Sequence, residues 1–140
     1  MRGAMSQPDP IPYSDAQIRG ILERVRTIAM VGASSNWNRP SYFVMKYLQG
    51  KGYRVIPVNP GIAGQQLLGE TVYAALGDIP MELIGPVDMV DVFRRPHDIN
   101  GHIEDILAKQ PKAVWFQSGI RNDGAAEIFA KSGIKVVQDR

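Results

Sequence analysis

Short, almost unbroken apolar runs recur along the chain, and each gap between them is long enough for one helix. The five runs lie at residues 28–31, 55–58, 89–93, 113–116 and 134–137. Strands of a parallel sheet that is covered by helices on both faces have this composition, because neither face of the strand meets water. The pattern therefore predicts five buried, mostly parallel strands.

The segments between the runs carry apolar residues at helical spacing. Helices are therefore predicted at 42–48, 71–76, 98–107 and 123–131. Asn122 is a suitable N-cap for the last of these helices. Glycines suit the position just after a helix end, and three occur at such places, namely Gly52, Gly77 and Gly133. The stretch 59–70, rich in Gly and Gln, is predicted to be a surface loop.

A further amphipathic helix is predicted before the first strand, at residues 15–24. Ser14 and Gln17 have the spacing of a capping box, and apolar residues follow at helical intervals, namely Ile18, Ile21, Leu22 and Val25. Residues 1–13 include three prolines between positions 6 and 12 and are predicted to form an irregular lead-in.

Strands that alternate with helices predict right-handed crossovers. The predicted fold class is α/β, a Rossmann-like, doubly wound, mostly parallel five-stranded sheet with helices on both faces, formed by residues 14–140 as one domain. In such a sheet, ligands bind outside the carboxyl ends of the strands, where the strand order reverses. The residues that follow each strand are therefore the candidate site.

Four short loops follow the predicted strands and are expected to share one edge of the sheet. Together they supply small residues, amides and guanidinium groups. The loops are Gly32, Ala33, Ser34 and Ser35; Asn59, Pro60 and Gly61; Arg94, Arg95 and Pro96; and Gln117, Ser118 and Gly119.

The first loop has the residue types of a phosphate-binding turn. Small side chains let backbone N–H groups approach a phosphate, and Arg39, Pro40 and Ser41 open the next helix, whose N-terminus adds a partial positive charge. Guanidinium groups of Arg94 and Arg95 are suited to holding phosphate oxygens in pairs. A tight turn without a ligand and a solvated pair of surface charges are the alternative interpretations.

The first loop lacks the dinucleotide fingerprint G-x-G-x-x-G, because Ser34 and Trp37 occupy its second and third glycine positions. The second strand is followed by Asn59, where NAD-binding proteins carry an acidic residue for the ribose hydroxyls. NAD is therefore disfavoured, whereas a ligand with an additional phosphate on its ribose is acceptable. An NAD(P)-dependent oxidoreductase or an NAD(P)-binding regulatory domain is the alternative function.

Composition narrows the classes of function. The chain has 140 residues, of which 44% are hydrophobic and 21% charged, as expected for a folded domain. Sixteen Lys and Arg nearly balance fourteen Asp and Glu, and the basic residues form no stripe, so no nucleic-acid partner is predicted. No apolar run reaches the roughly 20 residues that cross a bilayer, so no membrane partner is predicted. Zero cysteines fit a cytoplasmic location.

No catalytic and no metal-ligating residue is predicted. The chain has no cysteine, and its two histidines, His97 and His102, are expected on a helix surface. No Ser-His-Asp order and no G-x-S-x-G elbow occurs. The residues thus favour binding over catalysis.

Three segments, taken together and in this order, resemble the CoA-binding domain family. They are the run 28–35 followed by the opening helical turn at 39–41, then 55–60, then 92–96. These family members are small stand-alone bacterial proteins similar to the N-terminal domain of the succinyl-CoA synthetase alpha subunit, and the resemblance covers about residues 15–140. In the synthetase, the phosphorylated histidine lies in a later domain, which this chain does not contain. The resemblance therefore implies a carrier, sensor or accessory protein that binds CoA or acyl-CoA and has no catalytic activity of its own. It leaves the identity of any protein partner open.

The resemblance also implies roles for individual residues. The pyrophosphate is expected on residues 32–35 and on the turn at 39–41. Val58, Asn59 and Pro60 are expected to flank the adenosine, where an acidic side chain would repel the 3′-phosphate. Phe93, Arg94 and Arg95 are expected to face the ligand, and residues 117–119 to line the side towards the pantetheine.

Overall fold

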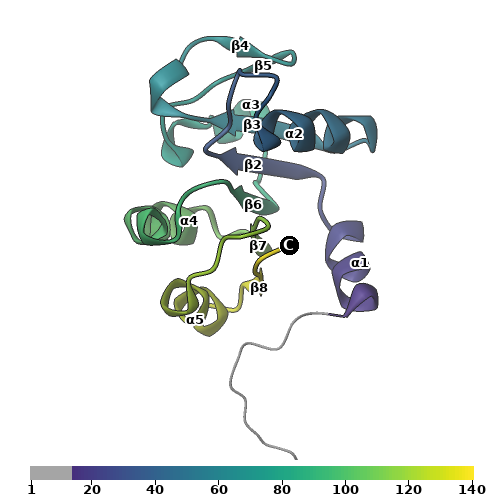
Figure 1. Cartoon of the computed structure of the whole chain (residues 1–140), viewed down its shortest axis with the longest axis vertical. Helices are drawn as coiled ribbons and strands as arrows, with labels where there is room; N and C mark the ends of the chain where they lie inside the picture. The colour runs from purple at the N-terminus through teal and green to yellow at the C-terminus, as the bar shows by residue number, and fades with distance from the viewer. Residues whose placement is uncertain (1–13) are drawn as a thin grey trace, which may run out of the picture.

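A five-stranded, all-parallel sheet forms the centre of the computed structural model, which describes residues 14–140 (Figure 1). The predicted lead-in at 1–13 lies outside the described residues. The strand order is β3-β2-β6-β7-β8. The strands are β2 (Thr27–Val31), β3 (Arg54–Val58), β6 (Met89–Val92), β7 (Ala113–Phe116) and β8 (Lys135–Val137). The five predicted strands and the doubly wound α/β fold are confirmed.

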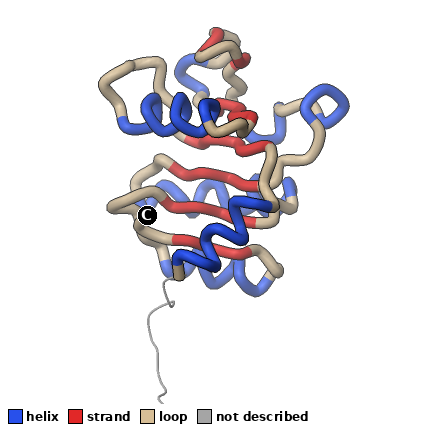
Figure 2. The backbone as a smooth tube through the Cα atoms, turned by 90° about the vertical axis from the view of Figure 1, so that its right-hand side faces the viewer, coloured by secondary structure: helices blue, strands red, loops and turns tan. Residues whose placement is uncertain are grey.

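Helices cover both faces of this sheet, as Figures 1 and 2 show. One face carries α1 (Asp15–Glu23) and α2 (Pro40–Gly50). The other carries a 3-10 helix, η3 (Pro96–His102), followed by α4 (Ile103–Lys109), and then α5 (Asp123–Lys131). No helix within residues 14–140 combines the length and the apolar character that a membrane span requires.

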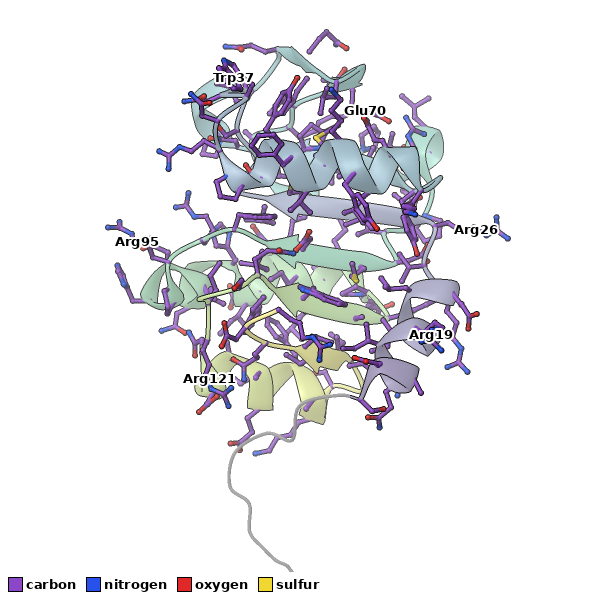
Figure 3. The ribbon with its side chains drawn as sticks, turned by 45° about the vertical axis from the view of Figure 1, so that its right-hand side comes forward. Arg19, Arg26, Trp37, Glu70, Arg95 and Arg121 are labelled. Carbon is purple, nitrogen blue, oxygen red and sulfur yellow. The ribbon has the colours of Figure 1, made fainter. Side chains whose placement is uncertain are left out.

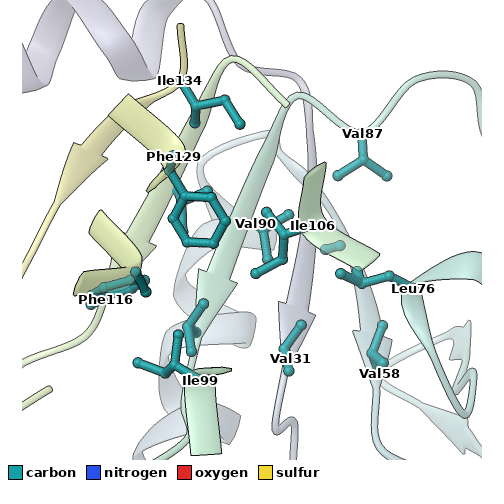
Figure 4. Packing of buried hydrophobic residues seen from close by; sticks show 14 of the residues in the cluster. Val31, Val58, Leu76, Val87, Val90, Ile99, Ile106, Phe116, Phe129 and Ile134 are labelled. Carbon is teal, nitrogen blue, oxygen red and sulfur yellow. The ribbon is translucent and has the colours of Figure 1, made fainter. Parts of the chain in front are cut away.

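Two separate clusters of buried apolar side chains fill the spaces between the sheet and its helices. Met30 and Met45 belong to the cluster beneath α1 and α2. Ile106, Phe116 and Phe129 belong to the cluster beneath α4 and α5 (Figure 4), where the two phenylalanine rings meet edge to face with centroids 6.4 Å apart. Because successive residues of each strand point to opposite faces, one apolar run supplies both clusters.

The predicted helix ends are largely confirmed. Ser14 Oγ accepts a hydrogen bond from the Gln17 backbone N–H, and Gln17 Oε1 accepts one from the Ser14 N–H, which completes the capping box of α1. Asn122 Oδ1 accepts from the Ala125 N–H at the start of α5. Gly52 and Gly133 have φ of +97° and +83° just after helices, as the position after a helix end requires.

The predicted helix at 71–76 is wrong. Residue 71 ends β5 (Glu70–Thr71), which pairs antiparallel with β4 (Gln66–Leu67), and Gly77 lies inside the 3-10 turn η2 (Leu76–Asp78) rather than after a helix. Val72 and Leu76 have helical spacing, but Val72 is buried in the cluster beneath α2 and Leu76 in the opposite cluster. The segment therefore passes around the edge of the sheet, and its apolar residues are buried on different faces of the sheet.

Three other expectations need adjustment. The stretch 59–70 is not only a loop, since it contains a 3-10 helix, η1 (Pro60–Ile62), strand β4 and the start of β5. Leu68 and Gly69, both at positive φ, form the two-residue turn of the small hairpin. The helix predicted at 98–107 is 3-10 up to His102 and α-helical only after it. A short helix, α3 (Met81–Ile84), was not predicted.

The strand order reverses between β2 and β6. The chain passes from β2 through α2 to β3 at one edge, then returns to place β6 on the other side of β2. Gly32, directly after β2, has φ of +87°, and a Cβ atom there would lie 2.3 Å from the Phe93 carbonyl oxygen at the end of β6. Only glycine fits, because any side chain would collide with the backbone of the neighbouring strand.

We expect Gly32→Ala to lower the free energy of unfolding by about 2–4 kcal/mol, because it adds a backbone collision to the strain of a positive φ. Gly52→Ala is the matched control: its φ is +97°, and nothing lies within 4 Å of an added Cβ. The control should lose only about 1 kcal/mol. Urea denaturation of both variants measures the difference, and equal losses would contradict the close approach.

Candidate functional site

A cleft of about 780 Å³ opens along the carboxyl edge of the sheet, at the point where the strand order reverses. This volume lies in the range of small-molecule and cofactor sites. Residues from all four candidate loops reach it, together with the first turn of α2. Its lining consists of Gly32, Ser34, Arg39, Pro40, Ser41, Val44, Asn59, Phe93, Arg94, Arg95, Pro96, Gln117, Ser118, Gly119 and Ile120.

Gly61 of the candidate loops does not line this cleft, and neither do four of the sixteen residues to which the resemblance assigns a role. Ala33 and Val58 are buried in the core on opposite faces of the sheet. Ser35 and Pro60 are exposed beside the lining. The remaining twelve predicted residues all lie in the wall of the cleft, and their contact with a ligand stays a prediction.

Two lining residues were missed by sequence reasoning, namely Val44 and Ile120. Val44 lies four residues after Pro40 and three after Ser41, so helical spacing places it on the same face of α2. That spacing was a usable signal. Ile120 follows Gly119 in the loop after β7, and nothing in its apolar side chain distinguishes it from a core residue.

Hydrogen bonds join the first residues of the loop after β2 to the end of β3, and the residues that follow them have unpaired backbone amide donors. The Gly32 N–H donates to the Val58 carbonyl oxygen at 3.0 Å. Asn59 Nδ2 donates to the Ala33 carbonyl at 2.7 Å, which joins this loop to the end of β3. Within residues 14–140, the backbone N–H groups of Ser34 and Ser35 donate to no group. The loop therefore offers two amide donors next to the cleft.

The N-terminus of α2 adds positive potential to the same wall. Arg39 is the N-cap and makes no side-chain capping hydrogen bond, and Pro40 occupies the first helical position. The first turn of a helix carries unsatisfied N–H groups and a partial positive charge. No side chain of the described residues caps this helix end, and the end lines the cleft.

Three arginines and no acidic residue line the cleft, although the chain as a whole has a net charge of only +2. Arg95 is the outer one, largely exposed and paired with Asp98 Oδ2 at 3.1 Å. Figure 3 shows it on the opposite side of the molecule from Arg26. Arg39 is also exposed. The cleft is thus locally cationic in a nearly neutral protein, an arrangement that attracts anions.

Arg94 is the inner arginine and lies across the Gly32 turn. Its Cδ atom would be 3.1 Å from a Cβ added at Gly32. Its Nε atom is buried and has no hydrogen-bond partner among the described residues. A buried donor without an acceptor costs free energy. The wall of the cleft therefore contains a guanidinium N–H that lacks an acceptor.

A buried carboxyl lies below the cleft, which the sequence analysis did not predict. Asp91, in β6, is 1% exposed and accepts a hydrogen bond from Gln117 Nε2. Burial raises the pKa of Asp91 from 3.8 to about 7, and the hydrogen bond from Gln117 acts in the opposite direction. An aspartate inside an apolar run was the available signal.

The two histidines lie near the rim and not in the lining. His97 is exposed, with Nε2 3.5 Å from Asp98 Oδ1. Burial lowers the pKa of His102, and the Arg94 charge lowers it further. Within residues 14–140, no three His, Cys, Asp or Glu side chains form a group that would hold a metal ion.

The pH dependence of stability tests the state of Asp91. Its pKa is raised on folding, so its contribution is fully present below pH 4 and is lost as the pH rises towards 7. The unmodified protein should lose about 1.4 kcal/mol of its free energy of unfolding per pH unit between pH 4 and 7 through Asp91, whereas Asp91→Asn should not. The free energy of unfolding of the variant minus that of the unmodified protein should therefore increase by this amount per pH unit. Urea denaturation across this range measures the difference. A difference that is independent of pH would mean that Asp91 titrates alike in both states.

The parallel sheet defines a Rossmann-like domain, and the cationic cleft at its switch point is the candidate small-molecule site. The chain belongs to the CoA-binding domain family, because the family model described as CoA binding domain matches residues 26–140. The resemblance carried by the three sequence segments is thereby confirmed.

Similar proteins span nearly the whole chain. The uncharacterized protein YneT of Bacillus subtilis is 37% identical over 126 residues, which are 90% of this chain and 89% of that protein. The solved structure of cell-free ID.343 from Thermus thermophilus has a TM-score of 0.85 at 41% identity and covers 91% of this chain and 92% of its own. Neither name states an activity.

A larger enzyme contains the same fold. The dinucleotide-forming acetyl-coenzyme A synthetase 1 of Ca. Korarchaeum cryptofilum, solved with phosphate and ADP, aligns with a TM-score of 0.62 at 23% identity. The alignment covers 79% of this chain and 25% of that enzyme. At this identity the likeness concerns the fold alone.

Proposed function

We propose that this protein binds CoA or an acyl-CoA in the cleft and acts as a carrier, sensor or accessory protein without chemistry of its own. The observation that carries the proposal is the buried Arg94 Nε–H, which lacks an acceptor and lies across the Gly32 turn at the switch point of the sheet. A diphosphate oxygen supplies the acceptor that this donor lacks.

The geometry around Arg94 suits a diphosphate. The amides of Ser34 and Ser35 and the uncapped N-terminus of α2 border the same cleft. Backbone donors and a helix N-terminus together form an anion-binding site. In our proposal the diphosphate lies on this turn, and the positive charges of Arg94 and Arg39 neutralise part of its negative charge.

The residues after β3 suit the adenosine end of CoA better than that of NAD. Asn59 uses Nδ2 and Oδ1 to join the neighbouring loops, since Oδ1 also accepts from the Gly61 N–H at 2.8 Å. Its place in the wall therefore carries no negative charge, so a ribose 3′-phosphate meets no repulsion there. We propose that the segment after β3 flanks the adenosine through Asn59, which lines the wall of the cleft.

The lining of the cleft also suits the pantetheine arm of CoA. Phe93, Val44 and Ile120 supply apolar surface, and residues 117–119 supply amide and hydroxyl groups. Pantetheine has the same mixed character, with two amides on an aliphatic chain. None of the lining residues within 14–140 is a carboxylate, an imidazole or a lysine, and this composition supports binding without catalysis.

Thermal unfolding with four ligands tests the proposal. At a concentration one hundred times its Kd, a ligand stabilises the fold by roughly 2.7 kcal/mol, which corresponds to a rise in Tm of roughly 9 °C for a domain of this size. We expect this rise with CoA, a smaller one with dephospho-CoA and NADP, and the smallest with NAD. No shift with CoA at millimolar concentration would contradict the proposal.

Arginine variants locate the binding site. We expect Arg94→Ala to weaken CoA binding by about 10- to 100-fold, because it removes a charge-assisted hydrogen bond from a buried position. Arg26→Ala is the matched control, since Arg26 is exposed just before the amino end of β2, on the opposite side of the molecule from Arg95 (Figure 3). It should change the Kd less than twofold. Equal Kd values for the two variants in calorimetry would mean that CoA does not meet Arg94.

A further inference from the structure

Asp91 is a buried titratable group that the proposed binding site does not use. Its register partners are Met30 in β2 and Trp115 in β7. Met30 belongs to the apolar cluster beneath α1 and α2, and Trp115 packs against it. Asp91 therefore points its carboxyl into a largely apolar layer, where a charge is costly.

One hydrogen bond joins this carboxyl to the cleft. Gln117 Nε2 donates to Asp91 Oδ1, and Gln117 itself lines the cleft. Asp91 also precedes two lining residues of the same strand end, Phe93 by two positions and Arg94 by three. The carboxyl thus lies under the wall against which an anionic ligand would bind.

We propose that Asp91 is a positioning residue that holds Gln117 in the cleft wall, and that binding of a CoA-type polyanion is coupled to uptake of one proton from solvent by the Asp91 carboxylate. The inference rests on the proposed function. Gln117 Nε2 donates more strongly to a carboxylate than to the carbonyl oxygen of a carboxylic acid, but it can donate to either, so the wall keeps its shape when the charge is removed.

The direction of the coupling follows from electrostatics. With its pKa raised by burial to about 7, Asp91 is about half protonated at neutral pH in the free protein. A ligand that brings negative phosphates and expels water from the cleft favours the neutral form further. By linkage, the ligand must then bind more tightly as the pH falls.

Other titratable groups are few near Asp91. The segments packed on its face contribute apolar residues, namely Ile21 from α1, Val25 from the turn after α1, Met45 from α2 and Val137 from β8. Burial raises the pKa of Asp91, the hydrogen bond from Gln117 lowers it, and no charged side chain of the described residues contributes to the shift. His102, whose pKa Arg94 helps to lower, is the titratable group to control for on the cleft side.

Calorimetry with dephospho-CoA between pH 6 and 8 tests the coupling. This probe lacks the 3′-phosphate, whose own ionisation falls near pH 6 and would obscure that of the protein. If binding raises the pKa of Asp91 by about one pH unit, affinity should be about fivefold higher at pH 6 than at pH 8. Titrations at pH 7 in buffers of different ionisation enthalpy should show uptake of roughly 0.4 proton per ligand.

Variants separate charge from position. Asp91→Asn keeps an acceptor for Gln117 Nε2 without a charge, so it should bind at pH 8 about as tightly as the unmodified protein does at pH 6, with no dependence on pH. Asp91→Leu removes the acceptor and should bind the ligand several-fold more weakly than Asp91→Asn at both pH values. Tight binding by the asparagine variant would then show that the acceptor for Gln117, and not the charge, positions the wall. His102→Gln should keep the pH profile of the unmodified protein.

The outcomes distinguish this inference from the function on which it rests. If Asp91→Asn keeps the pH dependence, or if the unmodified protein binds without proton uptake, the coupling is overturned while CoA binding stands. If neither CoA nor dephospho-CoA binds the folded protein anywhere between pH 6 and 8, the proposed function fails and this inference fails with it. Should Asp91→Leu not fold, the proton count and the asparagine variant still decide.

Discussion

The close approach of two backbones at the switch point is the constraint on which the site depends. The Phe93 carbonyl oxygen occupies the space that a side chain at position 32 would need. With glycine there, the loop after β2 passes directly over the end of β6, and Arg94 lies across the turn. This contact brings amide donors, a helix N-terminus and a guanidinium group into one cleft, although they come from separate segments of the chain. A bulkier residue would separate them.

The cleft and the layer beneath it contain polar groups that do not serve stability. Arg94 Nε is buried without an acceptor, and Asp91 is a carboxyl among apolar side chains. Each destabilises the fold. The rest of the sheet compensates, since its strands are buried on both faces and packed by two apolar clusters. Local conflicts of this kind are concentrated at functional sites in proteins.

The sequence predicts the regular part of this molecule well. Five apolar runs become five strands, and four loops that are distant in the chain reach one cleft, because the ends of parallel strands share an edge. The failures have a common physical origin: which face a residue meets is a tertiary property. Val72 and Leu76 look like one helical face but are buried on opposite sides of the sheet. Ala33 and Val58 belong to candidate segments yet point into the core. The consequence of Asp91 in an apolar run becomes visible only when Gln117 is placed over it.

A crystal structure of the protein grown with excess coenzyme A tests the central claim most directly. The account predicts diphosphate oxygens within hydrogen-bond distance of the Ser34 and Ser35 amides and of Arg94 Nε, with the backbone at Gly32 unchanged. Coenzyme A bound elsewhere on the surface, or an Arg94 side chain turned away from the bound diphosphate, would contradict it.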